Sequence, residues 1–396
     1  MAISDVQEYT HLTSEEVEQL GRELDAIRAE VEESRGDADA AYINRMITVQ
    51  RRLAAVARVT LMASRWKPAW VAGTTMLGVA KILENMEIGH NVMHGQWDWM
   101  NDPEIHSSTW EWDTAQPAEQ WKHSHNYVHH QFTNVLGHDN DIGYGILRMA
   151  REQKWHPANL GQPVYNAALA LLFQWGVALH DLDLEAIRKR EKDPKVMRKQ
   201  LRQIGQKVRR QFAKDYVVYP ALSGPGWKST MTADATANLI RNVWSYGIIF
   251  CGHFPDGALH FTEEELEDET RAEWYLRQLL GSANFTGGRL LHILSGSLGF
   301  QIEHHLYPDL PSNRYPEIAV KVRALCEKYD LPYTTGPLWR QYGQVLRTIM
   351  KLSLPNGLTT SDQPEPPTPP VSRGRLRDDQ RPSRRLETGA WSRASA

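Results

Sequence analysis

Residues 90–94 read HNVMH, and this stretch, together with two later histidine clusters, decides how the sequence is interpreted. The later clusters are HSHNYVHH at residues 123–130 and QIEHH at residues 301–305. On a helix, His90 and His94 lie on one face about one turn apart, which is a spacing suited to two metal ligands. Imidazole binds iron, zinc and copper well, so the clusters predict a metal site.

The number of clustered histidines indicates more than one metal ion. A zinc site uses four ligands or fewer, and the clusters supply seven histidines at ligand spacing. Asn91 follows the first histidine where a zinc-protease motif needs glutamate, so that class is excluded. We therefore expect two metal ions. The candidate ligands within the clusters are His90, His94, His125, His129, His130, Gln301, His304 and His305.

Composition excludes several other classes of protein. The net charge of -3 and the pI near 6.6 give no sign of nucleic-acid binding, and the mean hydropathy of -0.52 on its own suggests a soluble protein. The two cysteines, Cys251 and Cys326, cannot form a disulfide framework and suit a reducing compartment. The polar, acidic first residues predict no secretory signal.

Apolar segments predict a helical protein with short membrane-associated pieces. Residues 14–36 form an amphipathic pattern, with Ser14 expected to cap the helix and Gly36 to end it. Residues 53–64 and 68–83 are each shorter than the roughly 20 residues of a spanning helix, and together they predict a helical hairpin. Two further apolar pieces, 216–227 and 242–255, flank a polar segment that contains Asp234 and Arg241.

The membrane topology is predicted from charge. Residues 155–180 contain no Asp, Glu, Lys or Arg, whereas residues 188–214 carry twelve Lys or Arg. Excess basic charge beside apolar segments is typical of the cytoplasmic side, where anionic lipid also attracts it. If 160–180 crossed the membrane, the basic run and the first two histidine clusters would lie on opposite sides. We therefore expect 160–180 to be an interfacial or buried helix. A solvated helical surface is an equally good interpretation of the basic run.

The chain is expected to divide into three parts. Residues 1–44 hold the N-terminal amphipathic helix, residues 45–355 form the main domain, and residues 356–396 form a disordered tail. The tail is rich in Pro, Ser and Arg and has almost no apolar residues, so it cannot offset its ordering entropy by burial.

The three clusters, in their order and spacing, resemble the histidine boxes of the membrane fatty acid desaturases. The resemblance rests on ENMEIGHNVMHGQWDWM (84–100), WKHSHNYVHH (121–130) and FQIEHHLYPDLPSNRY (300–315), and covers about residues 45–350. It implies an all-α, membrane-associated fold with short transmembrane helices and a cytoplasmic histidine-rich cap. That cap would hold two non-haem irons at the cell membrane.

The resemblance also assigns roles to single residues. Gln301 takes the first position of the third box, where many members have histidine. The resemblance therefore implies that Gln301 is a metal ligand, holds a water molecule, or is a hydrogen-bond partner of the metal ligands. The family tends to supply one further histidine before the third box, and His253 in FCGHFP fits that place, with His260 as the alternative. Some members hold a bridging water on an asparagine one turn earlier, where this chain has Ile249.

The implied reaction is insertion of a cis double bond into a fatty acyl chain, with acyl-CoA as the expected form of the substrate and O2 as co-substrate. Removing hydrogen from an unactivated methylene requires an oxidant that no side chain supplies, but iron with dioxygen and two electrons does. The chain has no GxGxxG, no cysteine cluster and no HPGG motif. We therefore expect a separate electron donor, such as a ferredoxin, a cytochrome or an NAD(P)H-dependent flavin reductase.

Three alternatives stay open at this point. The boxes do not separate a desaturase from a related di-iron hydroxylase of fatty acids or alkanes, or from a non-catalytic lipid- or metal-binding membrane protein. A soluble carboxylate-bridged di-iron protein needs two ExxH motifs, and only Glu87 to His90 supplies one at the boxes.

Other polar and aromatic residues near the boxes have less specific interpretations. Asp139 and Asp141 in GHDNDIGYG are interpreted as a polar turn in preference to partners of the ligands. The tryptophans near the boxes suit an acyl tunnel or an interfacial belt equally well; they are Trp97, Trp99, Trp110, Trp112 and Trp121.

Overall fold

The computed structural model describes residue 6, residues 8–180, residues 182 and 187, and residues 193–356. Its α-helices are α1 (Ser14–Ser34), α2 (Asp37–Leu61), α3 (Lys67–Ile82), α4 (Asn91–Met93), α5 (Ala118–Trp121), α6 (Gln162–Leu171), α7 (Phe173–His180), α9 (Pro194–Phe212), α10 (Tyr219–Leu222), α11 (Trp227–His253), α12 (Arg271–Leu280), α13 (Arg289–Leu294), α14 (Gln301–Leu306), α15 (Tyr315–Lys328) and α16 (Leu338–Leu352).

Shorter elements join these helices. The π-helices are η2 (Leu83–His90), η4 (Lys122–His129) and η7 (Ala213–Val218). The 3-10 helices are η3 (Asp98–Met100), η5 (Ile142–Gly145), η6 (Pro157–Gly161), η8 (Gly224–Gly226), η9 (Glu263–Leu266), η10 (Leu298–Phe300) and η11 (Ser312–Arg314). The strands β1 (Asn284–Thr286) and β2 (Thr335–Pro337) pair in parallel, with Asn284 opposite Thr335.

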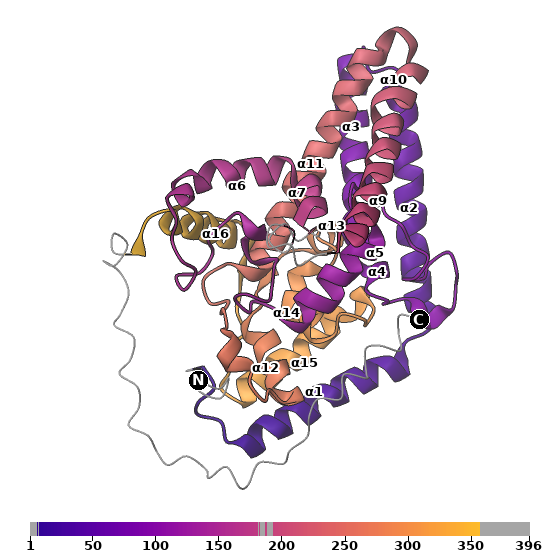
Figure 1. Ribbon diagram of the computed structural model, residues 1–396. Helices are drawn as coiled ribbons and strands as arrows, with labels where there is room; N and C mark the ends of the chain where they lie inside the picture. The colour runs from indigo at the N-terminus through magenta and orange to yellow at the C-terminus, as the bar shows by residue number, and fades with distance from the viewer. Residues whose placement is uncertain (1–5, 7, 181, 183–186, 188–192, 357–396) are drawn as a thin grey trace.

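Two helical hairpins form a stalk that rises from the rest of the molecule (Figure 1). The first is α2 and α3, joined by a turn at residues 62–66, which confirms the hairpin predicted from the two apolar pieces. The second joins the continuous run α9–η7–α10 to α11. Helix α3 packs against both α2 and α11, so the two hairpins form one bundle.

Ion pairs lie inside this stalk. They explain how the polar segment that contains Asp234 and Arg241 is accommodated in a buried helix. Asp234 and Arg241, expected between two apolar pieces, are buried on the single helix α11. Arg58 of α2 forms an ion pair with Asp234 and lies 2.6 Å from Asp215, which also lies 2.8 Å from the Lys81 amine. Buried charges are tolerated when they are paired, so these side chains cross-link the four helical segments.

The remaining helices form a head below the stalk, and α1 runs along its lower edge (Figure 1). Leu20, Leu24 and Val31 of α1 share one buried cluster with Ile302 and Leu306 of α14. The N-terminal helix therefore supports the segment that carries the third histidine cluster. The expected domain boundary between residues 44 and 45 falls inside α2.

The start of α1 differs by one residue from the prediction. Thr13, not Ser14, is the capping residue: its hydroxyl accepts a bond from the Glu16 amide at 3.3 Å, and Glu16 accepts one from the Thr13 amide at 2.8 Å. This reciprocal arrangement satisfies two amides that the first helical turn leaves without partners. Arg35 is the C-cap of α1, and Gly36, expected to end that helix, is instead the N-cap of α2.

The charge-free segment 155–180 folds as two short helices. Helices α6 and α7 are separated by Leu172, and α6 extends to the left of the stalk above α16 (Figure 1). Over the described residues, no helix combines the length and the apolar character that crossing a membrane requires. The expected tail at 356–396 lies outside the described residues apart from Asn356.

Candidate metal centre

Four histidines from all three sequence clusters meet in a first group. The ligand atoms of His90, His94, His125 and His304 lie within 4.8 Å of one another. His90 ends the π-helix η2, and His125 lies within η4. His90 Nε2 is 3.2 Å from His94 Nε2 and 3.4 Å from His125 Nε2. Single wide π turns occur frequently at functional sites, and here they carry the clustered side chains.

A second group lies beside the first. It consists of His129, His253 and His305, whose ligand atoms also lie within 4.8 Å of one another. His253 is the last residue of α11, and its Nε2 is 3.3 Å from His305 Nε2. The structure therefore brings His253 into the site from the stalk, whereas His260 lies outside both groups.

Gln301 and His130 complete the set of predicted residues. Gln301 Nε2 is 2.9 Å from His253 Nε2, and its buried Oε1 makes no hydrogen bond. A side chain at Gly252 would place its Cβ 2.8 Å from Gln301 Cδ, so glycine allows the third cluster to pack on α11. The His130 ring lies between the groups, 4.9 Å from His304 and 4.4 Å from His305.

These residues fit metal ions by distance and by unsatisfied atoms. Two nitrogens that bind the same metal ion at about 2.1 Å lie roughly 3.0–3.4 Å from each other. The range covers nitrogen–metal–nitrogen angles from the octahedral to the tetrahedral value. The measured separations between Nε2 atoms are 3.2–3.4 Å. Buried polar atoms normally have partners, yet His129 Nε2, His304 Nε2 and both His130 nitrogens have none. That the nine predicted residues bind metal stays a prediction.

Two carboxylates hold histidines of the second cluster, which the interpretation of 137–145 as a polar turn missed. His129 Nδ1–H donates to Asp139 at 3.0 Å, and His125 Nδ1–H donates to Asp141 at 3.4 Å. His180 Nε2 is 3.3 Å from the other oxygen of Asp141. The segment is a turn, but its carboxylates also fix the rings with Nε2 directed toward the cluster, as outer partners of metal ligands do.

The third cluster is oriented by side chains that no local pattern indicates. His304 Nδ1–H donates to the Tyr315 hydroxyl at 3.2 Å, and His305 Nδ1–H donates to Gln278 Oε1 at 3.1 Å. Gln278 lies on α12 and Tyr315 begins α15. Each of these bonds occupies Nδ1, so Nε2 is again the atom left for a metal.

Burial keeps most of these imidazoles neutral. Desolvation, followed by repulsion from neighbouring histidines, holds the pKa of His94, His130, His253 and His305 well below the usual value. Burial also lowers the pKa of His129, but the carboxylates of Asp139 and Asp141 outweigh it and raise that pKa. A neutral imidazole has a free lone pair, so the buried set is ready to bind a cation.

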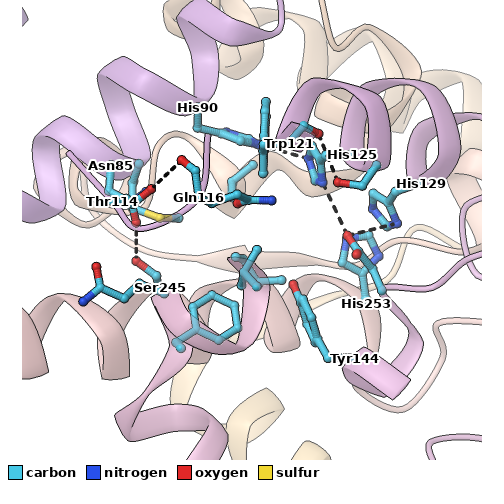
Figure 2. A pocket seen from close by; sticks show the side chains of 18 of the residues that line it. Asn85, His90, Thr114, Gln116, Trp121, His125, His129, Tyr144, Ser245 and His253 are labelled. Carbon is cyan, nitrogen blue, oxygen red and sulfur yellow. Dashed lines mark hydrogen bonds and ion pairs between the residues drawn. The ribbon is translucent and has the colours of Figure 1, made fainter. Parts of the chain in front are cut away.

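A pocket adjoins the histidines and is shown in Figure 2. His129 and His253 lie at one end, and Asn85, Thr114 and Ser245 lie at the other. Its lining also contains apolar side chains, which include Trp112, Trp121, Phe173, Val177, Ile249 and Leu298. Long apolar pockets beside a reactive centre suit an extended apolar ligand.

Some of the other predicted residues line this cavity, and others lie elsewhere. Trp112 and Trp121 line it, so two of the five tryptophans suit the tunnel interpretation, whereas Trp97 packs with Ile43 elsewhere. Ile249, which stands where some desaturases have asparagine, also lines the cavity. His123 is exposed, and its ring lies 5.8 Å from the Tyr127 ring at a tilt of 52°.

Comparison with known proteins identifies the family. The fatty acid desaturase family model matches residues 64–337. The chain is 55% identical over 360 residues to the NADPH-dependent stearoyl-CoA 9-desaturase of Mycobacterium tuberculosis, covering 90% of this chain and 84% of that protein. The chain belongs to the fatty acid desaturase family. It is also 24% identical over 331 residues to the sn-1 linoleoyl-lipid 6-desaturase of a Synechocystis species, covering 81% of this chain and 90% of that protein.

The desaturase family membership confirms the resemblance seen in the three boxes. All three lie inside the matched residues, as do His253, Asp139 and Asp141. The structure adds that the boxes converge beside a cavity that is partly lined by apolar side chains.

Replacing Asp139 by alanine is expected to lower desaturase activity and iron affinity by about 10–100-fold, because outer partners of metal ligands contribute on this scale. His129 would lose the carboxylate that orients its ring. Asp139→Asn keeps an acceptor oxygen for the turn amides of Asn134 and Asp141 and should lose less. Iron titration of the purified variants measures the effect.

The matched control is Glu263→Ala, which removes a carboxylate from the exposed His138, 3.4 Å away and outside the cluster. It should leave iron affinity unchanged. Equal iron affinity in Asp139→Ala and the unaltered protein would contradict the assigned role.

Proposed function

We propose that this desaturase inserts a cis double bond into a fatty acyl chain, using O2 and two electrons at a pair of non-haem irons held by the histidine groups. The single observation that carries the proposal is the position of two histidine groups beside a cavity that is partly lined by apolar side chains. When bound, the irons would supply the oxidant that no side chain can provide.

The first group would hold one iron through His90, His94, His125 and His304. The second would hold the other through His129, His253 and His305, with His130 and Gln301 completing the shells. The carboxylates of Asp139 and Asp141 fix two ligand rings, so little reorganisation is needed when a metal binds. Burial of the cluster excludes water, and the cavity wall fixes which methylene lies beside the histidines.

The substrate we propose is an acyl-CoA. The relative from Mycobacterium tuberculosis is named a stearoyl-CoA 9-desaturase and is similar along most of both chains. The apolar side chains that line the cavity would contact the acyl chain. Indole rings at Trp112 and Trp121 offer flat apolar walls beside His90 and His125.

The electrons would come from a separate protein, such as an NADPH-dependent flavin reductase or a ferredoxin. Two observations support this: the chain lacks motifs for flavin, haem or iron–sulfur binding, and the relative is named NADPH-dependent. Pure protein with stearoyl-CoA, NADPH and O2 should give no product, and adding a reductase system should start double-bond formation.

Mass spectrometry with assignment of the double-bond position measures the product. Hydroxylated chains in place of alkenes would show that the related hydroxylase reaction is correct. Full turnover with NADPH and the pure chain alone would contradict the separate donor.

We further propose that the stalk attaches the enzyme to the cell membrane, with the metal centre on the cytoplasmic side. Exposed apolar side chains near the stalk tip support lipid contact, including Met62, Trp66 and Leu222 at 50, 67 and 61% exposure. The basic helix α9 lies nearer the head than α10 (Figure 1), where anionic cytoplasmic lipid would attract it. Release from cell membranes by salt or alkaline carbonate alone would contradict insertion of the tip.

A further inference from the structure

The end of the cavity away from His129 and His253 is lined by polar side chains. Helix α11 supplies one wall, with His253 at the metal end, then Ile249 and Ser245, and finally Arg241 and Asn242. His253 and Arg241 are twelve residues apart, which corresponds to about 18 Å along a helix. Figure 2 shows the same polarity, with Asn85, Thr114 and Ser245 grouped opposite His129 and His253.

Arg241 is a buried cation in this wall with unused hydrogen-bonding capacity. Its side chain lines the cavity and is 1% exposed. Nη1–H donates to the Asp113 carbonyl at 3.2 Å, and Nε–H donates to Asn242 Oδ1 at 3.3 Å. The buried Nη2 makes no hydrogen bond within the protein.

Of the nearby carboxylates, Asp113 and Asp215 are paired with other cations, whereas Glu84 accepts a hydrogen bond from the Asp113 amide at 2.8 Å. Asp113 accepts from Lys81 at 3.4 Å and also from Lys214, and Asp215 accepts from Lys81 and Arg58. Within the described part of the chain, Arg241 has no carboxylate within ion-pair distance. Its direct hydrogen-bond partners are therefore the Asp113 carbonyl and the Asn242 amide oxygen, and the Asp113 and Glu84 carboxylates act on its charge from farther away.

A methyl group pressed against this wall would be unfavourable. A buried guanidinium needs polar partners, and an apolar group at Nη2 would leave it unsatisfied. Gln174 and Asn242 add further polar groups at the same end; they bond Gln211 at 3.0 Å and the Leu171 carbonyl at 2.8 Å. Burial of an acyl chain is therefore favourable only as far as the polar end of the cavity at Arg241.

We propose that Arg241, with Gln174 and Asn242, ends the acyl-binding part of the cavity and sets the longest chain that the enzyme accepts. The inference rests on the proposed acyl substrate and adds the residue that determines its length. A charged wall limits the acyl-chain length more sharply than an apolar wall does. The next methylene group gains no free energy from burial there, and it also separates polar groups from their hydrogen-bond partners.

The test compares acyl-CoAs of increasing chain length on the unaltered protein, on Arg241→Met and on Arg241→Lys. Competition binding to the iron-loaded protein and product formation with a reductase system are both measured. Each added methylene that becomes buried should raise affinity roughly fourfold. Arg241→Met should therefore bind and desaturate longer chains than the unaltered protein does, whereas Arg241→Lys should keep the original limit.

Arg209→Met is the matched control, since Arg209 is exposed on α9 and lies outside the cavity. It should leave the length profile unchanged. Gln174→Met provides a second variant if Arg241→Met does not fold, and it should shift the profile in the same direction. A folded Arg241→Met or Gln174→Met protein with the original profile would overturn the inference.

The binding arm separates this inference from the proposed function. If the unaltered protein binds acyl-CoA with a length limit but forms no alkene, the proposed reaction fails while the role of Arg241 is still tested. If alkene forms and the variants do not shift the limit, the reaction stands and the inference fails.

Discussion

Replacing His253 by alanine is expected to lower desaturase activity by more than about 100-fold, beyond the loss caused by removing an outer partner of a ligand. The iron content should fall from about two ions per chain to about one, because the second group would keep only His129 and His305 among its histidines. Metal analysis and product formation on the same purified sample measure both effects.

The comparison that decides the role of His253 is His260→Ala. His260 is half-buried and stacks on Phe254, but it lies outside both histidine groups. Its replacement should leave the iron content near that of the unaltered protein, whereas His129→Ala should resemble His253→Ala. Normal iron and normal turnover in His253→Ala would show that the three boxes alone hold the metals.

Removing the metal is expected to abolish turnover completely. The protein purified without chelators should contain about two irons per chain, since the two histidine groups offer separate sets of three or four ligands. Chelation should also lower the midpoint of thermal unfolding, because buried imidazole nitrogens without partners destabilise the folded state. Elemental analysis and thermal unfolding before and after chelation measure these changes.

Readdition of ferrous iron to the chelated protein should restore both activity and the unfolding midpoint. Zinc should restore the midpoint only, because it does not change oxidation state. One tightly bound zinc ion and no iron in the purified protein would remove the di-iron proposal.

The carboxylates that orient the histidines of the second box were not predicted from the local sequence pattern. Asp139 and Asp141 stand close after the second box, and their glycine-rich surroundings correctly indicated a turn. Nothing in the spacing says that the turn folds back on η4 and places Asp139 3.0 Å from His129 Nδ1. Acidic residues within about ten positions of a histidine cluster are the signal that could have found them.

The sequence by itself determined the clusters, the helical class and the first hairpin. Histidines at spacings of three to five residues identify ligands within one element, and apolar periodicity identifies helices, because both depend on neighbours along the chain. The family resemblance also indicated His253, which no local pattern supports.

Only the tertiary structure decided which histidines share a group, and it divides each adjacent pair. His304 joins His90, whereas His305 joins His253, because neighbouring residues on a helix point about 100° apart. Gln278, Tyr315 and Arg241 reach the site or its cavity from distant elements. Contacts between such elements depend on how the helices pack, and the spacing of residues along the sequence does not indicate that packing.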